Sequence, residues 1–316
     1  MRVWRMEQKK EYNRRILNIL GFSFGKEILE LLQDEDVIEV MLNPDGKLWI
    51  DTLSGGQRDT ELFVDADTAM RIINTVATHV KTIVDERNSG LSAELPETGF
   101  RFEGRVPPTV KNPSFTIRKM STLVFSLRDY VNMGCLNESQ LDIIEKAIHD
   151  RKNILVVGGT SSGKTTFVNA CIGSIKKDER LLILEDTREL QSLCPNTVFF
   201  KTSDYTSMTD LLKTTMRYRP DRIIVGEIRG KEALDLLTAW NSGHPGGIST
   251  IHSDSAIGGL RQLEQYIERV SVNKQQELIG KTVDIIVVLK RERGLRKVTS
   301  ITELVEFNKG YILKEF

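Results

Sequence analysis

The run Gly158-Gly159-Thr160-Ser161-Ser162-Gly163-Lys164-Thr165 constrains the fold of this chain more than any other stretch. It satisfies the pattern GxxxxGK followed by Ser or Thr, comes after an apolar run and precedes a helix-compatible run, Thr166–Ile172. Glycines let the backbone turn tightly enough to direct several N–H groups, and the N-terminus of the following helix, at phosphate oxygens. The sequence therefore predicts a strand, a phosphate-binding loop and a helix in succession.

Two side chains of this loop are predicted to act on a nucleotide directly. Lys164 is expected to bridge the β- and γ-phosphates of ATP, and the Thr165 hydroxyl to hold the Mg²⁺ that neutralises developing charge. The remaining predicted nucleotide-binding residues here are Gly158, Gly159, Thr160, Ser161, Ser162, Gly163 and Thr166. ATP and Mg²⁺ are therefore the expected ligand and cofactor.

The two halves of the 316-residue chain differ in their patterns, which predicts two domains. From Asn153 onward, short β-type runs alternate with helical ones, which is typical of a largely parallel sheet with crossover helices. These runs are Ile154–Val157, Leu181–Leu184, Thr197–Phe200, Ile223–Val225, Ile248–Ile251 and Asp284–Leu289. We predict an α+β domain at residues 1–120, a linker at 121–136 and an α/β domain at 137–316.

The first half has shorter and more mixed patterns. Apolar residues at helical spacing over Glu7–Gln33, interrupted at Gly21–Gly25, predict two helices. Two β-type runs separated by the turn-forming residues Asn43 to Gly46 predict a hairpin. The predicted elements that follow the two helices are strands at Val37–Leu42 and Lys47–Ile50, a helix at Asp67–Val80 and a strand at Ser114–Lys119.

Carboxylates follow two of the predicted parallel strands, at the edge of the sheet where ligands bind. One strand runs into Glu185-Asp186-Thr187-Arg188-Glu189, and another into Gly226-Glu227. Hydrolysis requires such groups to organise a metal and an attacking water. Gly226 stands where many phosphate-loop proteins have Asp, so we expect it to leave room for phosphates or water, with Glu227 holding the metal through water.

Histidines and arginines supply further candidates. His252 ends a strand-like run and His244 lies in a glycine-rich stretch, so both are expected near the nucleotide, whereas His79 and His149 lie in helical patterns and have structural roles. A positive charge near the γ-phosphate stabilises the transition state, and a neighbouring subunit can supply it. The candidates, among which sequence spacing does not choose, are Arg101, Arg105, Arg118, Arg217, Arg219 and Arg229.

Composition excludes several classes of protein. Lys plus Arg and Asp plus Glu both total 44, so no global positive field exists to hold nucleic acid, and direct nucleic-acid binding is not expected. Three distant cysteines without CxxC spacing, and no long apolar run, favour a cytoplasmic protein. Arg2 to Arg15 carries six basic and two acidic residues. This segment is either a solvated helix face or a contact with an anionic membrane surface.

Four stretches together resemble one family: GGTSSGKTT, LEDTREL, RPDRIIVGEIRG and GHPGGISTIHSDS. They resemble the phosphate loop, Asp box, glutamate-type Walker B and His box of the hexameric traffic ATPases of type II and type IV secretion. VIEVMLNPDGKLWID and LSAELPETGFRFEGRVPP further resemble the TrbB-like ATPases of P-type conjugative transfer systems. The absence of a tetracysteine motif from the sequence favours the type IV branch.

This resemblance implies a RecA-like phosphate-loop domain preceded by a smaller domain that covers the nucleotide, in a ring of six subunits. It implies that Glu189 is the catalytic glutamate, that Glu227 assists the metal and that His252 senses the γ-phosphate. Arg101 and Arg118 are then expected to reach the nucleotide from the first domain, and Arg229 belongs to the predicted nucleotide-binding set. The implied partners are inner-membrane subunits of a secretion or conjugation apparatus, with peripheral association at the inner face of that membrane.

The predicted function is ATP hydrolysis that powers assembly of, or transfer through, a conjugative type IV secretion system. A nucleic-acid translocase or helicase remains an alternative, since related RecA-like cores serve that purpose, although the neutral net charge disfavours it. A small-molecule kinase is a third hypothesis, which the lack of an Arg-rich lid-like insertion after the phosphate loop disfavours.

Overall fold

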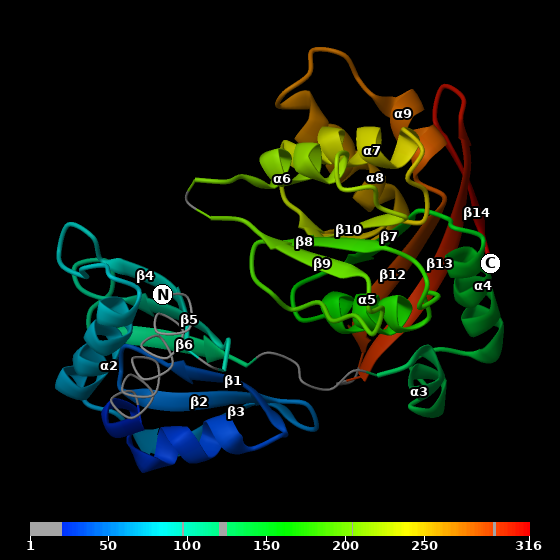
Figure 1. Cartoon of the computed structure of the whole chain (residues 1–316). Coiled ribbons are helices and arrows are strands. Elements are labelled where there is room, and N and C mark those ends of the chain that lie inside the picture. The colour runs from blue at the N-terminus through cyan, green and yellow to red at the C-terminus, as the bar shows by residue number, and fades with distance from the viewer. Residues whose placement is uncertain (1–20, 97, 120–124, 204, 293–294) are drawn as a thin grey trace. The chain divides into compact units, whose positions relative to one another are not determined.

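The computed structural model describes residues 21–96, 98–119, 125–203, 205–292 and 295–316. The chain divides into two compact units, residues 1–122 and 123–316, each of which is described by itself (Figure 1). Residues 2–15, for which the basic character was noted, lie outside the described residues.

The first unit is built on a six-stranded antiparallel sheet in the order β3-β2-β1-β6-β5-β4. The predicted hairpin is confirmed: β1 and β2 pair, and between them Gly46, at φ +84°, donates its N–H to the Asn43 carbonyl. Helix α2 (Ala66–His79) buries one face in the core of this unit. The strands are β1 (Val37–Leu42), β2 (Lys47–Thr52), β3 (Gly56–Phe63), β4 (Gly90–Glu94), β5 (Arg101–Arg105) and β6 (Ser114–Arg118).

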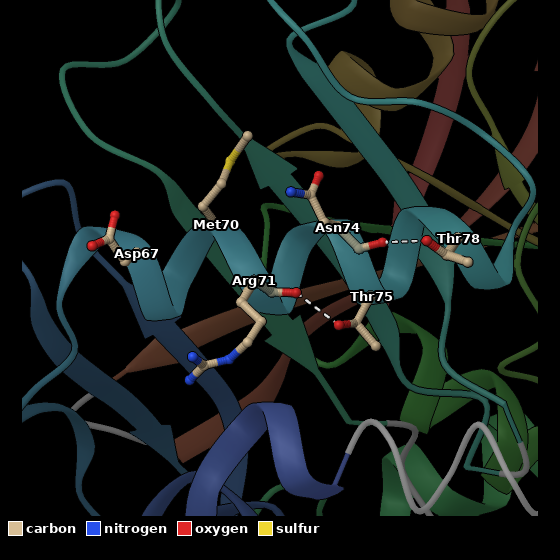
Figure 2. Close-up of a pocket in the computed structure, with 6 residues that line it drawn as sticks. All are labelled: Asp67, Met70, Arg71, Asn74, Thr75 and Thr78. Carbon is tan, nitrogen blue, oxygen red and sulfur yellow. Dashed lines mark hydrogen bonds between the residues drawn. The ribbon is translucent and has the colours of Figure 1, made fainter.

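The opposite face of α2 is polar and borders a hollow of about 450 Å³ (Figure 2). Two threonine hydroxyls on it donate back to the helix, Thr75 to the Arg71 carbonyl and Thr78 to the Asn74 carbonyl. Their hydrogen-bonding capacity is thus partly used within the helix. Ahead of the sheet, residues 21–33 form one continuous helix, so the predicted interruption at Gly21–Gly25 is not seen, although Gly25 has φ +76°. The part of the predicted helical segment before residue 21 lies outside the described residues.

The second unit confirms the predicted parallel sheet with crossover helices. Its eight strands lie in the order β14-β13-β12-β7-β11-β10-β8-β9. The six from β12 to β9 are parallel, and β13 and β14 add an antiparallel edge. The strands are β7 (Ile154–Gly158), β8 (Leu181–Glu185), β9 (Thr197–Lys201), β10 (Arg222–Ile228), β11 (Ile248–Ile251), β12 (Ile285–Glu292), β13 (Leu295–Phe307) and β14 (Tyr311–Glu315).

Helices cover both faces of this sheet, each over its own hydrophobic cluster. Three helices pack on one face: α3 (Leu127–Asn132), α4 (Glu138–His149) and α5 (Lys164–Gly173). The helices on the other face are α6 (Met208–Thr215), α7 (Glu232–Asn241), α8 (Ala256–Glu268) and α9 (Gln276–Thr282). This arrangement brings the carboxyl ends of β7, β11, β10 and β8 to one edge of the sheet.

Part of the range given to a linker, 121–136, is ordered within the second unit. Helix α3 begins after Ser126, whose side chain and that of Asp129 form a reciprocal capping box. Leu127 and Tyr130 are buried in the core beneath it. A helix of six residues is too short to produce a recognisable period, so the sequence pattern did not predict it.

Candidate active site

The phosphate loop joins β7 to α5 through backbone conformations that few residues tolerate. Ser161 has φ +57° and Gly163 has φ +89°, both in the left-handed region. A Cβ atom at Gly158 would lie 2.4 Å from the Ser162 hydroxyl and 2.8 Å from the Leu289 carbonyl oxygen. The glycines at 158 and 163 are therefore needed for the loop to close.

The loop has the features of an anion site. Gly163 caps α5 without a side-chain hydrogen bond, so the first N–H groups of the helix point out of its end unsatisfied by a cap. The Ser162 hydroxyl is buried and has no hydrogen-bond partner in the described structure. Lys164 is also buried, and its ammonium donates to the carbonyls of Gly158 (2.8 Å) and Gly159 (3.0 Å). These groups fit the phosphates of a nucleotide.

Lys164, His252 and Glu227 form a continuous chain of contacts across three strand ends. The Lys164 ammonium lies 3.3 Å from His252 Nδ1, and His252 Nε2 lies 2.6 Å from Glu227 Oε1. Arg229 Nε donates to the other Glu227 oxygen over 2.6 Å, and Arg229 also lies 3.6 Å from Asp186. The structure thus brings four of the predicted site residues into one cluster.

His252 is neutral in this cluster. Burial, and then the Lys164 charge, lower its pKa, while Glu227 acts in the opposite direction. Because Nδ1 faces an ammonium that can only donate, we assign the proton of the neutral ring to Nε2, towards Glu227. His252 therefore links the Glu227 carboxylate to the Lys164 ammonium.

The acidic loop after β8 is held by Glu185, the last residue of that strand. The Glu185 carboxylate is buried, and its Oε1 accepts the backbone N–H groups of Glu189 and Leu190, each over 2.8 Å. Burial raises the pKa of Glu185 to about 7. A Cβ at Gly226 would lie 3.1 Å from Glu185 Cγ, so the glycine gives space to the side chain of Glu185. The expectation that Gly226 also leaves room for phosphates or water stays a prediction.

A family model described as "Type II/IV secretion system protein" matches residues 37–295. The range contains the phosphate loop, both acidic loops and His252. The chain belongs to this family. The resemblance seen in the four sequence stretches is thereby confirmed, and the cluster described above lies within the matched range.

Individual family members match most of the chain. The "probable conjugal transfer protein TrbB" of Sinorhizobium fredii is 45% identical over 308 residues, which cover 96% of this chain and 94% of that protein. The type IV secretion system protein VirB11 of Bartonella henselae is 32% identical over 321 residues, with 87% and 90% covered. The TrbB-like resemblance read from the first half of the sequence is therefore confirmed.

Solved structures confirm the predicted fold class. The Legionella pneumophila ATPase DotB aligns with a TM-score of 0.61 at 17% identity, over 83% of this chain and 74% of DotB. The pilus retraction motor PilT with bound ADP aligns with a TM-score of 0.61 at 18% identity, over 91% and 81%. These alignments cover 83% and 91% of this chain, so the shared fold includes parts of both of its units.

The arginine candidates fall in three places in this secretion-family chain. Arg229 lies in the cluster, whereas Arg217 and Arg219 precede β10 and so lie at the opposite edge of the sheet from the phosphate loop. Arg101 and Arg118 are paired across β5 and β6 in the first unit, and their approach to a nucleotide stays a prediction. Arg105, also in the first unit, forms an ion pair with Glu103.

The other histidines lie away from the cluster. His244 precedes β11, so it lies at the amino end of the strand whose carboxyl end leads to His252, and its Nδ1 is 3.3 Å from the Ala239 carbonyl. The expectation that His244 faces the nucleotide is therefore not supported by its position. His79 ends α2 and His149 ends α4, beside Asp150.

The sequence pattern placed Glu185 among the candidate carboxylates but not as a residue that holds a loop, and it did not point to two other residues that hold the loops of the site. These are the buried Asn169 of α5 and Arg296 of β13, whose Nε donates to the Ser161 carbonyl over 3.2 Å. The polar character of Asn169 within an otherwise apolar helix, FVNACI, was the one available signal. Arg296 lies on a strand 135 positions after Ser161 in the chain, and no local sequence pattern indicates this contact.

Proposed function

We propose that this chain hydrolyses Mg·ATP and, as a ring of six copies, powers the assembly of, or substrate transfer through, a conjugative type IV secretion system. The observation that carries the proposal is the contact chain from Lys164 through His252 to Glu227, which links a phosphate loop to a carboxylate. Similarity to a conjugal transfer protein over nearly the whole length supports the conjugative setting.

In this proposal the phosphate loop binds the triphosphate. The backbone N–H groups at the start of α5 and the Ser162 hydroxyl donate hydrogen bonds to the phosphate oxygens. Lys164 exchanges its bonds to the two loop carbonyls for the β- and γ-phosphates. That exchange moves the Lys164 ammonium relative to His252, so the His252 side chain is placed to respond to the γ-phosphate.

The Thr165 hydroxyl and Glu227 would hold Mg²⁺, since this ion takes few protein ligands alongside phosphates and water. When bound, Mg²⁺ neutralises charge on the phosphates. Glu189 orients the attacking water and accepts its proton. Arg229 orients Glu227 through its ion pair, and Arg101 and Arg118 act on the nucleotide from the first unit.

The motor role rests on two units in one chain, because a change of angle between them around a ring converts hydrolysis into motion. No helix in the described residues is long and apolar enough to cross a membrane. We propose a cytoplasmic protein that associates peripherally with inner-membrane subunits of the apparatus and does not bind nucleic acid directly.

Native mass spectrometry with and without Mg·ATP tests this function. The expected species is a hexamer that carries nucleotide, and monomers alone under both conditions would contradict the ring. Phosphate release measured with and without single-stranded DNA at two salt concentrations distinguishes the proposed secretion ATPase from the nucleic-acid translocase. The proposal predicts no stimulation, whereas a salt-sensitive increase would favour the translocase.

A further inference from the structure

The loop between β8 and β9, residues 186–196, has no helix or strand of its own. Its middle nevertheless makes four hydrogen bonds with two buried side chains, Glu185 and Asn169. Glu189, the proposed catalytic glutamate, lies within the part that these bonds hold. The position of its carboxylate therefore depends on groups outside the loop.

Glu185 holds the loop from the end of β8. Only 3% of this residue is exposed, and one of its oxygens accepts two consecutive backbone N–H groups, from Glu189 and Leu190. Its other oxygen is buried without a hydrogen-bond partner in the described structure. A carboxylate so placed is costly to bury, and the loop could be tethered more cheaply by a neutral side chain.

Asn169 holds the same loop from α5, the helix that begins at Lys164. It is 2% exposed, and its amide is used at both ends: Nδ2 donates to the Glu189 carbonyl over 3.1 Å and Oδ1 accepts the Gln191 N–H over 2.8 Å. Asn169 follows Lys164 by five positions in the same helix. The loop is therefore fixed relative to the helix that carries Lys164.

Gly226 provides the space that Glu185 needs. On the neighbouring strand β10, a Cβ at this position would lie 3.1 Å from Glu185 Cγ and 3.6 Å from its Oε1. The glycine that replaces the usual aspartate is thus explained by a neighbouring carboxylate. Gly226, Glu185 and the loop form one packed unit next to Glu227.

We propose that Glu185 and Asn169 are positioning residues that hold the Glu189 backbone in a fixed place relative to the phosphate loop. This inference rests on the proposed ATPase function. Neither residue needs to touch the nucleotide, because each acts through the backbone of the 189–191 segment. We call Glu185, Asn169 and their four hydrogen bonds to the 189–191 segment the clamp. A displacement of about 1 Å at a reacting group can cost about 10²-fold in rate, so loss of the clamp should affect turnover far more than nucleotide binding.

Steady-state kinetics of Glu185→Ala and Asn169→Ala test the clamp. Each variant should lower kcat by about 10- to 100-fold while the KM for ATP stays within about threefold of wild type. Glu185→Gln should stay within about fivefold of wild-type kcat, because its amide oxygen can accept both N–H groups. Equal losses for the Ala and Gln variants would overturn the clamp, since they would show that the charge and not the hydrogen bonds matters.

A second perturbation approaches the clamp from the other side. Gly226→Ala inserts a methyl group against Glu185 and should lower kcat by about tenfold. In a Glu185→Ala background the same change should cost less than about twofold, because the contacted side chain is gone. If Gly226→Ala lowers kcat by the same factor in both backgrounds, the proposed contact between residue 226 and Glu185 is contradicted. Gly173→Ala, at a glycine with no heavy atom within 4 Å of the added Cβ, is the matched control and should keep wild-type kinetics.

Binding of a fluorescent ATP analogue and thermal unfolding of every variant distinguish a displaced loop from a misfolded chain. Retained binding with lost turnover supports the clamp, and parallel loss of both overturns it. If the wild-type protein itself releases no phosphate from ATP, the proposed function fails. If the wild type turns over and Glu185→Ala does so equally well, the clamp fails while the function stands.

Discussion

The loops that follow β7 and β8 serve one site but are held in different ways. The phosphate loop takes its shape from its own residues, with left-handed conformations at Ser161 and Gly163 and a lysine that bonds to its own carbonyls. The acidic loop, by contrast, is held by Glu185 at its start and by Asn169 from another element. The first loop carries its structure locally, and the second acquires it only in the folded unit.

Because the two loops are held in different ways, we expect nucleotide binding and ATP hydrolysis to respond to different substitutions. A locally determined loop can bind phosphate as soon as β7 and α5 form, because its N–H groups are fixed by backbone conformation. A loop fixed by tertiary contacts holds Glu189 correctly only when β8, β10 and α5 are packed together. Removal of a phosphate contact from the phosphate loop should therefore abolish nucleotide binding, whereas changes around the acidic loop should spare binding and reduce turnover.

The largest expected effect comes from Lys164→Ala. Removing the ammonium takes away a direct phosphate contact, so kcat/KM for ATP should fall at least about 10³-fold. Phosphate release and nucleotide affinity, measured on the same preparation, should both be lost. Normal hydrolysis by this variant would contradict the assignment of the phosphate loop as the site.

A smaller effect concerns stability and pH. The pKa of Glu185 is raised from 4.5 to about 7 on folding, so its contribution to stability is present below pH 4.5 and lost as pH rises through 7. Glu185→Gln cannot ionise, so its unfolding free energy relative to wild type should increase by up to about 3 kcal/mol between about pH 5 and about pH 8. Urea unfolding at both pH values measures it, and a pH-independent difference would show that Glu185 does not titrate in this range.

The smallest effect is local to the phosphate loop. Gly163 has φ +89°, and a Cβ there would lie 2.8 Å from Arg296 Cδ. Gly163→Ala should lower the free energy of unfolding by about 1–3 kcal/mol, through backbone strain and this contact. Thermal unfolding beside Gly173→Ala checks the value. Equal stability of the two variants would show that the loop conformation is not as constrained as its dihedral angles indicate.

The fold could be predicted from the sequence wherever a pattern was local. The β-type runs of the second unit correspond to β7 to β12, because a parallel sheet buried on both faces gives short, strongly apolar strands. Strands β13 and β14 were missed, since this antiparallel edge has few fully buried residues and carries many charges. Strands β3, β4 and β5 escaped for the same reason.

The site could be predicted only in part. Lys164, Glu227, His252 and Arg229 follow strands in recognisable stretches, and the structure brings them together. Glu185 belongs to the acidic stretch that the sequence shows, yet only the fold reveals that its carboxylate accepts the backbone N–H of Glu189. Asn169 and Arg296 act through long-range contacts, which a one-dimensional pattern does not encode.

The most direct test of the division between binding and chemistry is the nucleotide content of Glu189→Gln. Glutamine keeps the size of the side chain and the clamped backbone but cannot accept a proton from water, so turnover should fall by about 10²- to 10³-fold. After incubation with Mg·ATP and removal of free nucleotide, the variant should retain ATP, whereas the wild type should contain mainly ADP. ADP in the variant, formed at the wild-type rate, would contradict the account.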